Sequence, residues 1–274
     1  MDSKKQFEEY VEKSRDLFDE DKMDEALVYL KKAIRINPHK ATLYFEWADY
    51  TKNFEHKSLR YAKGAAIDPN DAYFYDGWGS CLERQGKIEE AEKIYLRYAE
   101  SDIKPLFGLT KKIGRFLYKV GKFDEAIRVY SKELERNPKS MVFCNNIGYI
   151  LLSKGEYEDA ILQFERTIEI DREYLPPYLS ISTAYFQMGE LDKAKNFLEK
   201  ANELKKKDSD NYYLKQLNDF YQQDVALIKS FLEKATEESE KKILQKRLEG
   251  VEYIFNELTN TQNQKDLEIE SEAL

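Results

Sequence analysis

Apolar residues recur along most of the chain at intervals of three and four, and short polar stretches with glycine or proline separate the apolar segments. This spacing is typical of amphipathic helices that bury one face, so we predict an all-α fold. The pattern also repeats over a longer distance. Residues 121–127 read GKFDEAI, and residues 155–161, which begin 34 positions later, read GEYEDAI. Self-similarity at this period predicts a stacked array of helix pairs.

The repeat divides residues 7–208 into six predicted units, each a pair of antiparallel helices. Their bounds are about 7–40, 41–71, 72–106, 107–140, 141–174 and 175–208. Position eight of every unit is small, because the paired helices must approach closely there: Ser14, Ala48, Gly79, Gly114, Gly148 and Ser182. The second unit is three residues short around Phe54–Ser58, so an irregular turn between its helices is predicted.

Four glycines between the predicted helices are expected to end the first helix of their units. Glycine adopts the left-handed backbone conformation without a steric penalty, and this conformation commonly terminates a helix. The four are Gly86, Gly121, Gly155 and Gly189. An acidic residue follows most of these turns, where it favours the positive end of the next helix dipole.

At these recurrent positions the chain resembles the tetratricopeptide-repeat family. The matching residues are Trp78, Gly79, Leu82, Gly86, Ala91 and Tyr95 in the third unit, and Gly148, Leu151, Gly155, Ala160 and Phe164 in the fifth. The resemblance covers about residues 7–208. It implies a right-handed α-solenoid of about six helix-turn-helix repeats followed by C-terminal helices, and a non-enzymatic role as a scaffold or adaptor for other proteins.

Beyond the repeats, residues 209–259 are predicted to form further helices. The segment 240–258 carries apolar residues at spacings of four and three: Leu244, Leu248, Val251, Phe255 and Leu258. Two roles fit this face, since it can cap the exposed end of the array or pair two chains as a homodimer. Residues 260–274 are polar and acidic. We expect them to form a disordered tail that occupies the basic groove described below.

Composition and motifs narrow the function classes. The formal net charge is −8 and 35% of the residues are charged, which argues against nucleic acid or an anionic membrane as the main partner. His39 and His56 are expected in loops, Cys81 and Cys144 are isolated, and no glycine-rich phosphate loop is present. We therefore expect no catalytic residue, metal or cofactor. No apolar run is long enough to span a membrane, and a cytoplasmic location is the expectation.

The resemblance implies that the first helices line a concave groove, with positions two, five, six, nine, twelve and thirteen pointing inward. In the fourth unit the first helix has several cations and no acidic residue, so these cations have no partner of opposite sign along it. The residues predicted to bind a partner are Lys111, Lys112, Arg115, Lys119, Asn145, Asn146, Tyr149 and Thr183.

Such a surface suits an acidic peptide segment of a partner protein. Cations form charge-assisted hydrogen bonds with carboxylates, and asparagine amides can pair with a peptide backbone through both donor and acceptor. Three alternatives stay open. The basic helix can be a solvated face, the same strip can bind RNA, or the chain can associate with itself as a structural scaffold through its C-terminal helices.

Overall fold

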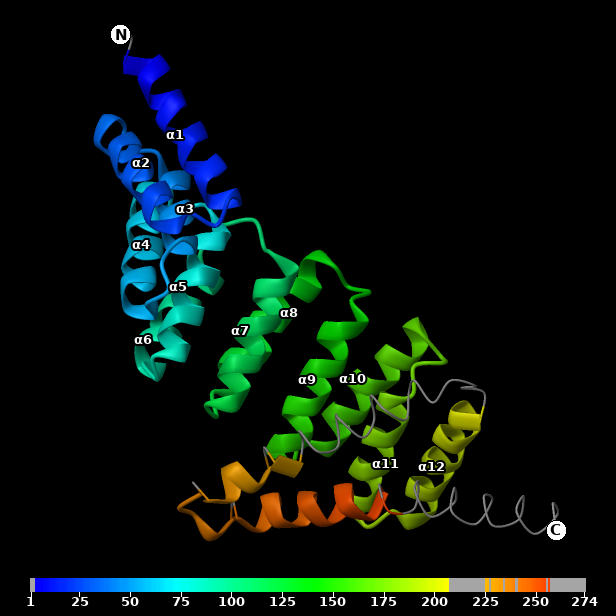
Figure 1. Ribbon diagram of the computed structural model, residues 1–274. Coiled ribbons are helices and arrows are strands. Elements are labelled where there is room, and N and C mark those ends of the chain that lie inside the picture. Colours follow the sequence, from blue (N-terminus) through cyan, green and yellow to red (C-terminus); the bar gives the residue numbers. More distant parts are fainter. Residues whose placement is uncertain are drawn as a thin grey trace, which may run out of the picture. The chain divides into compact units, whose positions relative to one another are not determined.

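The computed structural model describes residues 3–206, 225–226, 228–233, 235–239, 241–254 and 256, and every regular element in this part of the chain is a helix (Figure 1). The all-α prediction is therefore confirmed. Helices of the repeats are α1 (Ser3–Asp19), α2 (Met23–Ile36), α3 (Ala41–Asp49), α4 (Phe54–Ile67), α5 (Ala72–Arg84), α6 (Ile88–Glu100), α7 (Phe107–Lys119), α8 (Phe123–Arg136), α9 (Met141–Lys154), α10 (Tyr157–Ile170), α11 (Pro176–Met188) and α12 (Leu191–Lys206). Residues 225–226, 228–233, 238–239, 241–254 and 256 are also helical. The predicted boundary at residue 208 and the predicted tail, 260–274, lie outside the described residues.

The chain separates into two compact bodies, an N-terminal body (Met1–Ile113) and a C-terminal body (Gly114–Leu274), and the division falls inside α7. Within each body the helices pack in consecutive pairs. Contacts join α1 to α2, α3 to α4, α5 to α6, α9 to α10 and α11 to α12. This pairing is what the six predicted units require, because each apolar helix face needs a neighbour to cover it.

Close approach of the paired helices explains the small residue at position eight. Ser14 donates a hydrogen bond to the backbone carbonyl of Ala26 at 2.9 Å, and Ser182 donates one to that of Ala194 at 2.6 Å. In the middle units an aromatic ring of the second helix lies where a side chain at position eight would project. Three glycines have such a ring against them: Gly79, Gly114 and Gly148.

The predicted left-handed glycines are also confirmed. The φ angle lies between 72° and 83° at Gly86, Gly121, Gly155 and Gly189. Asp21 has a φ of 60° and occupies the corresponding turn of the first unit. Because an aspartate tolerates this conformation better than most side chains do, the first unit can form the turn without a glycine.

The second unit is short mainly because its first helix, α3, is shorter than the other first helices. This helix has 9 residues, whereas the first helices α5, α7, α9 and α11 have 13 or 14. The difference is about one turn of helix. A four-residue connection, residues 50–53, then leads to α4, and Asn53 caps α4 by accepting a hydrogen bond from the backbone N–H of His56 at 3.0 Å. The expectation that His56 lies in a loop is therefore wrong, since it belongs to the first turn of α4.

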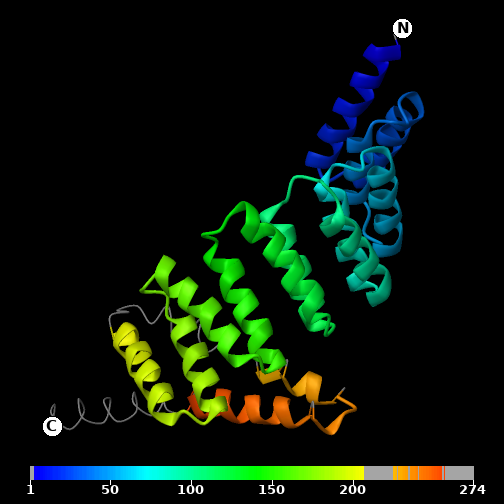
Figure 2. The ribbon, with the colours of Figure 1, turned by 180° about the vertical axis from the view of Figure 1, so that it is seen from behind.

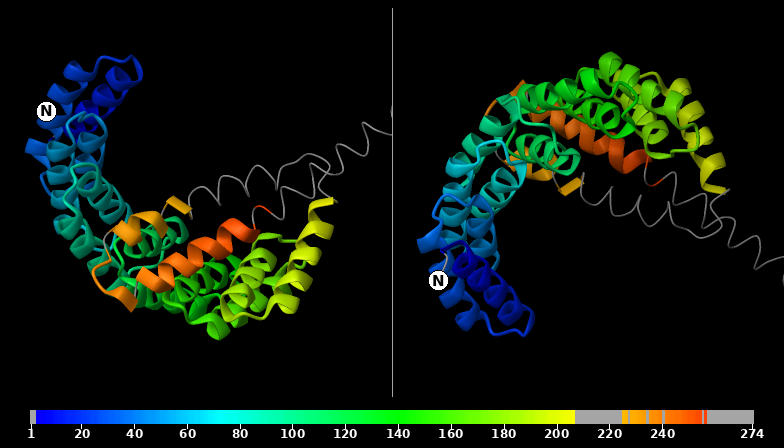
Figure 3. Two further views of the ribbon diagram at one scale, coloured as in Figure 1. Left: turned by 90° about the horizontal axis from the view of Figure 1, so that it is seen from below. Right: turned by 90° about the horizontal axis from the view of Figure 1, so that it is seen from above.

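Residues 241–254, which we call the C-terminal helix, pack against the repeats of the C-terminal body and run across the ends of α9 and α11 (Figures 2 and 3). Leu244 and Leu248 are buried in a cluster with Phe231, and Tyr118 of α7 packs against the same cluster. Ile254 is buried against α11 and α12. The part of the apolar face formed by Leu244, Leu248 and Val251 is thus covered within one chain, whereas Phe255 and Leu258 lie outside the described residues. Dimerisation stays a prediction.

Candidate functional site

The first helices α7, α9 and α11 all contact the C-terminal helix through side chains at positions twelve and thirteen of their units. The hydroxyl groups of Tyr118 on α7 and Ser153 on α9 lie 2.7 Å apart. Phe186 on α11 stacks on Tyr253 of the C-terminal helix, with ring centroids 4.8 Å apart. These positions belong to the set that the family resemblance predicts to point inward. We call Tyr118, Ser153, Phe186 and Gln187 the clamp residues.

Arg247 is the centre of this contact. Its side chain is 0% exposed, and its guanidinium donates hydrogen bonds to the hydroxyl of Tyr118 at 3.1 Å and to the hydroxyl of Ser153. A buried cation is costly unless its donors are satisfied, and these two hydroxyls supply acceptors from two different first helices. The positive charge also acts on Tyr157, where burial raises the pKa of the phenol and Arg247 partly opposes that rise.

Gln187 holds the other end of the clamp. It is 1% exposed and donates its amide hydrogen to the backbone carbonyl of Lys246, while Lys246 donates to the backbone carbonyl of Gln187. Gly250 faces the same glutamine, because a β-carbon at residue 250 would meet the Gln187 amide. A side chain at this position would have to displace the end of the Gln187 side chain, which bonds to the C-terminal helix.

One turn away from the clamp, the structure brings together two of the predicted binding residues. Arg115 of α7 and Asn146 of α9 both act on the hydroxyl of Tyr130 in α8. Burial raises the pKa of Tyr130, and the charge of Arg115 and the nearby amide of Asn146 lower it in part. Arg115 itself is exposed, so its charge is available to solvent on this side of the body.

Asn145 is one of the predicted residues with a buried polar atom that lacks a hydrogen-bond partner. Its side chain is 7% exposed, and its Oδ1 atom is buried without a hydrogen-bond partner in the described part of the chain. Tyr149 and Thr183 have packing roles. The ring of Tyr149 meets the ring of Phe164 edge-on at 5.2 Å, and the buried hydroxyl of Thr183 donates to the backbone carbonyl of Leu179 at 3.0 Å.

The interpretation that the cations of α7 lack partners of opposite sign is wrong for Lys112. Its ammonium pairs with Asp76 and donates to the hydroxyl of Ser80 at 3.0 Å, both on α5. Counting charges along one helix missed this pair because the carboxylate comes from the preceding unit. Lys111 is exposed and, like Lys112, belongs to the N-terminal body, whereas Lys119 is an exposed residue of the C-terminal body.

Sequence reasoning missed the contact of the C-terminal helix with Tyr118, Ser153, Phe186 and Gln187, and it missed Arg247 in particular. The apolar spacing of residues 240–258 directed attention to leucines alone. Gly250 carried a usable signal, because a glycine inside a helical pattern often marks the close approach of another element. Gln187 gave no such signal, since a glutamine near the end of a helix is ordinary.

Other chemistry is sparse among the described residues. They include no group of three or more His, Cys, Asp or Glu side chains placed to hold a metal ion, and none of their helices is both long and apolar enough to cross a membrane. Cys81 and Cys144 are buried free thiols, and burial raises the pKa of each.

Comparison with known families agrees with this geometry. Three tetratricopeptide-repeat family models match the chain, over residues 10–40, 112–174 and 151–217. The chain is a tetratricopeptide-repeat protein. The match extends beyond α12, whereas the C-terminal helix lies outside it. No curated protein matches the sequence.

Solved structures similar to this tetratricopeptide-repeat protein share its fold at low sequence identity. The MamA protein is 22% identical, with a TM-score of 0.54 over 63% of this chain and 95% of that chain. YrrB, described as a TPR protein with an unusual peptide-binding site, is 20% identical, with a TM-score of 0.53 over 68% and 97%. A tetratricopeptide repeat protein from Parabacteroides merdae is 17% identical, with a TM-score of 0.51 over 90% and 99%.

Proposed function

We propose that this tetratricopeptide-repeat protein is a non-enzymatic scaffold that binds an acidic segment of a partner protein on the inward face of its C-terminal body. The fold supports a protein-interaction scaffold in general terms, and helical arrays commonly act through extended binding faces. The residues proposed to contact the partner are Arg115, Lys119, Asn145 and Asn146, with Tyr149 and Thr183 supporting them.

The observation that carries the proposal is the clamp. Tyr118, Ser153, Phe186 and Gln187 already hold a helical segment, the chain's own residues 241–254, by hydroxyl, amide and aromatic contacts. A face that accepts one helix in this way has the shape and donor pattern of a helix-in-groove interaction. Arg115 and Asn146 lie on the same first helices, at positions nine and six, so they extend this face beyond the C-terminal helix.

The chemistry of the ligand follows from Arg115, Lys119 and Asn145. Two exposed cations attract a segment rich in carboxylates and can form charge-assisted hydrogen bonds with it. The buried Oδ1 of Asn145 requires a donor, and the backbone N–H of a bound peptide is a suitable one. YrrB, a protein of the same fold, is described as having a peptide-binding site, which makes a peptide the natural class of ligand to test.

Reversing the two exposed charges is expected to weaken peptide binding at least tenfold. The probe is a fluorescein-labelled, glutamate-rich helical peptide, and the measurement is fluorescence anisotropy with the full chain. Arg115→Glu with Lys119→Glu replaces attraction by repulsion at the proposed contact. The matched control is Arg128→Glu with Lys195→Glu, which changes the net charge equally at exposed residues of second helices. Equal weakening by both pairs would mean that only net charge attracts the peptide.

Replacing Asn145 by leucine is expected to move stability and binding in opposite directions. Removing a buried acceptor that lacks a partner is expected to raise the unfolding free energy by about 1 kcal/mol, because leucine has a similar size and needs no hydrogen bond. Peptide affinity is expected to fall at least fivefold, since the donor and acceptor of the amide are lost. Denaturant unfolding and the anisotropy titration give the two values, and unchanged affinity in the more stable variant would assign Asn145 to packing alone.

A further inference from the structure

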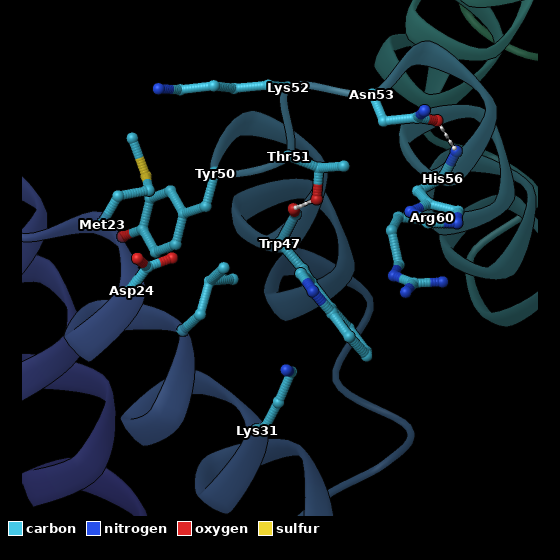
Figure 4. A pocket seen from close by; sticks show the side chains of 11 residues that line it. Met23, Asp24, Lys31, Trp47, Tyr50, Thr51, Lys52, Asn53, His56 and Arg60 are labelled. Carbon is cyan, nitrogen blue, oxygen red and sulfur yellow. Dashed lines mark hydrogen bonds between the residues drawn. The ribbon is translucent and has the colours of Figure 1, made fainter.

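The short second unit leaves a cavity in the N-terminal body. It has a volume of about 430 Å³ and lies among α2, α3, α4 and the connection that replaces the missing turn of α3 (Figure 4). Its lining residues are Met23, Asp24, Leu27, Lys31, Trp47, Tyr50, Thr51, Lys52, Asn53, His56 and Arg60. Residues 50–53 stand where a longer first helix would continue, and all four of them line the cavity. Its size is within the range of small-ligand sites.

Two cations flank the one tryptophan of this cavity. The Arg60 guanidinium carbon is 3.8 Å from the centroid of the Trp47 ring, and the Lys31 ammonium nitrogen is 5.9 Å from it. Trp47 lies between these two side chains in Figure 4. Its indole N–H has no hydrogen-bond partner within the described residues and is a further donor. Lys52 runs along the edge of the cavity, and His56 is on the same side as Arg60.

The positive charge of the cavity is not neutralised by the protein. Lys31, Lys52 and Arg60 form no ion pair in the part of the chain that the structure describes, and Asp24 is the single carboxylate among the lining residues. Three Lys and Arg cations and one carboxylate leave two positive charges. The Nε atom of Arg60 is buried and has no partner there, and burial lowers the pKa of its guanidinium. An anion would satisfy both the donor and the charge.

We propose that this cavity binds a phosphomonoester group, with the phosphate oxygens on Arg60, the charge of Lys31 acting from the other side of Trp47, and the organic part of the ligand against Trp47, Leu27 and Met23. A phosphomonoester carries about −1.5 to −2 charges at neutral pH, which balances the excess in the cavity, whereas a single carboxylate neutralises half of it. Arginine and lysine donors suit phosphate oxygens. The aromatic and apolar walls suit a ligand larger than the free ion.

This site goes beyond the proposed peptide-binding function, because its residues all lie within positions 23–60 of the N-terminal body. Two sources supply the same chemistry, a phosphorylated side chain of a partner protein and a small phosphorylated molecule. Both present a phosphomonoester dianion attached to an organic group. They differ in the organic part, so probes that share the phosphate and differ in that part can separate them.

Fluorescence of Trp47 provides the test. The chain has two tryptophans, so Trp78→Phe makes Trp47 the sole reporter in the full-length protein. Inorganic phosphate, phenyl phosphate and a short phosphoserine peptide are titrated at constant ionic strength. We expect saturable changes, with phenyl phosphate or the phosphopeptide binding at least fivefold more tightly than inorganic phosphate. The tighter of the two identifies an aromatic small molecule or a phosphorylated peptide as the closer ligand type.

Arg60→Gln is expected to weaken phosphate binding at least tenfold, and Arg35→Gln, which removes an exposed arginine of α2 outside the cavity, is expected to leave it unchanged. Lys31→Gln tests the same site without altering a buried group, should Arg60→Gln fail to fold by circular dichroism. Glutamate binding as tightly as phenyl phosphate would overturn the assignment to phosphate. A fluorescence change that is not saturable, or equal in the Arg60 and Arg35 variants, would overturn the site.

Discussion

Replacing Arg247 by alanine is expected to lower the unfolding free energy by about 3 kcal/mol. The side chain is completely buried, so its truncation leaves a cavity. It also removes the hydrogen bonds that the guanidinium donates to the hydroxyls of Tyr118 and Ser153. The loss is expected to be concentrated where the C-terminal helix meets α7, α9 and α11. Denaturant unfolding gives its size, and hydrogen exchange of residues 241–254 gives its location.

Two further substitutions decide what kind of contribution Arg247 makes. Arg247→Met keeps most of the volume and removes the charge, and Tyr118 and Ser153 can still bond to each other across 2.7 Å. We expect Arg247→Met to lower the unfolding free energy by less than half as much as Arg247→Ala, because apolar replacement of a buried ion is often tolerated. Gln245→Ala, at an exposed position of the same helix, is expected to change stability by less than about 0.5 kcal/mol. Equal losses for alanine and methionine would assign the contribution to the charge and its hydrogen bonds.

Gly114→Ala is expected to destabilise the C-terminal body by about 2 to 3 kcal/mol. Alanine is the better helix former by about 1 kcal/mol, but its β-carbon would overlap the ring of Tyr130, which is 1% exposed and has no room to move. Overpacking of this kind forces side chains from their rotamers or separates the two helices. Thermal and denaturant unfolding of the full chain measure the change.

Two glycines in comparable helices serve as controls for Gly114. Gly108 is in the same helix with nothing near its position, so Gly108→Ala is expected to be neutral or to stabilise by a few tenths of a kcal/mol. At Gly148 a β-carbon would be 2.7 Å from the ring of Phe164, a milder conflict, and the expected loss is about 1 to 2 kcal/mol. Losses of unfolding free energy that do not follow this order would show that contact with the aromatic ring is not what requires a small residue at position eight.

The repeat architecture was predictable because its causes are local and recur. Gly114 and Gly148 are small for one reason, the aromatic ring of the paired helix, and Gly121 and Gly155 are glycine for another, the left-handed turn. Each requirement returns at a fixed period, so two copies are enough to reveal it. The helix pairs then follow from the need to bury one apolar face per helix.

The candidate site was less predictable because its contacts join distant parts of the chain. Lys112 pairs with Asp76 from another unit, and Arg247 reaches Tyr118 from outside the repeats. Neither contact recurs at the period of the repeat, so the repeat pattern does not indicate it. The short length of the second unit was visible in the sequence, but the cavity beside its connection was not, because an irregular turn can equally be filled by neighbouring side chains.

The position of the C-terminal helix also has a consequence during synthesis of the protein. Chains emerge from the ribosome from the N-terminus, and their domains fold as they emerge. Tyr118, Phe123 and Phe186 are therefore made long before residues 241–254, which cover part of the surface around them. Until the C-terminal helix is synthesised, that aromatic surface is exposed on otherwise complete helix pairs. A chaperone or a wrong partner can therefore bind these aromatic residues during this interval.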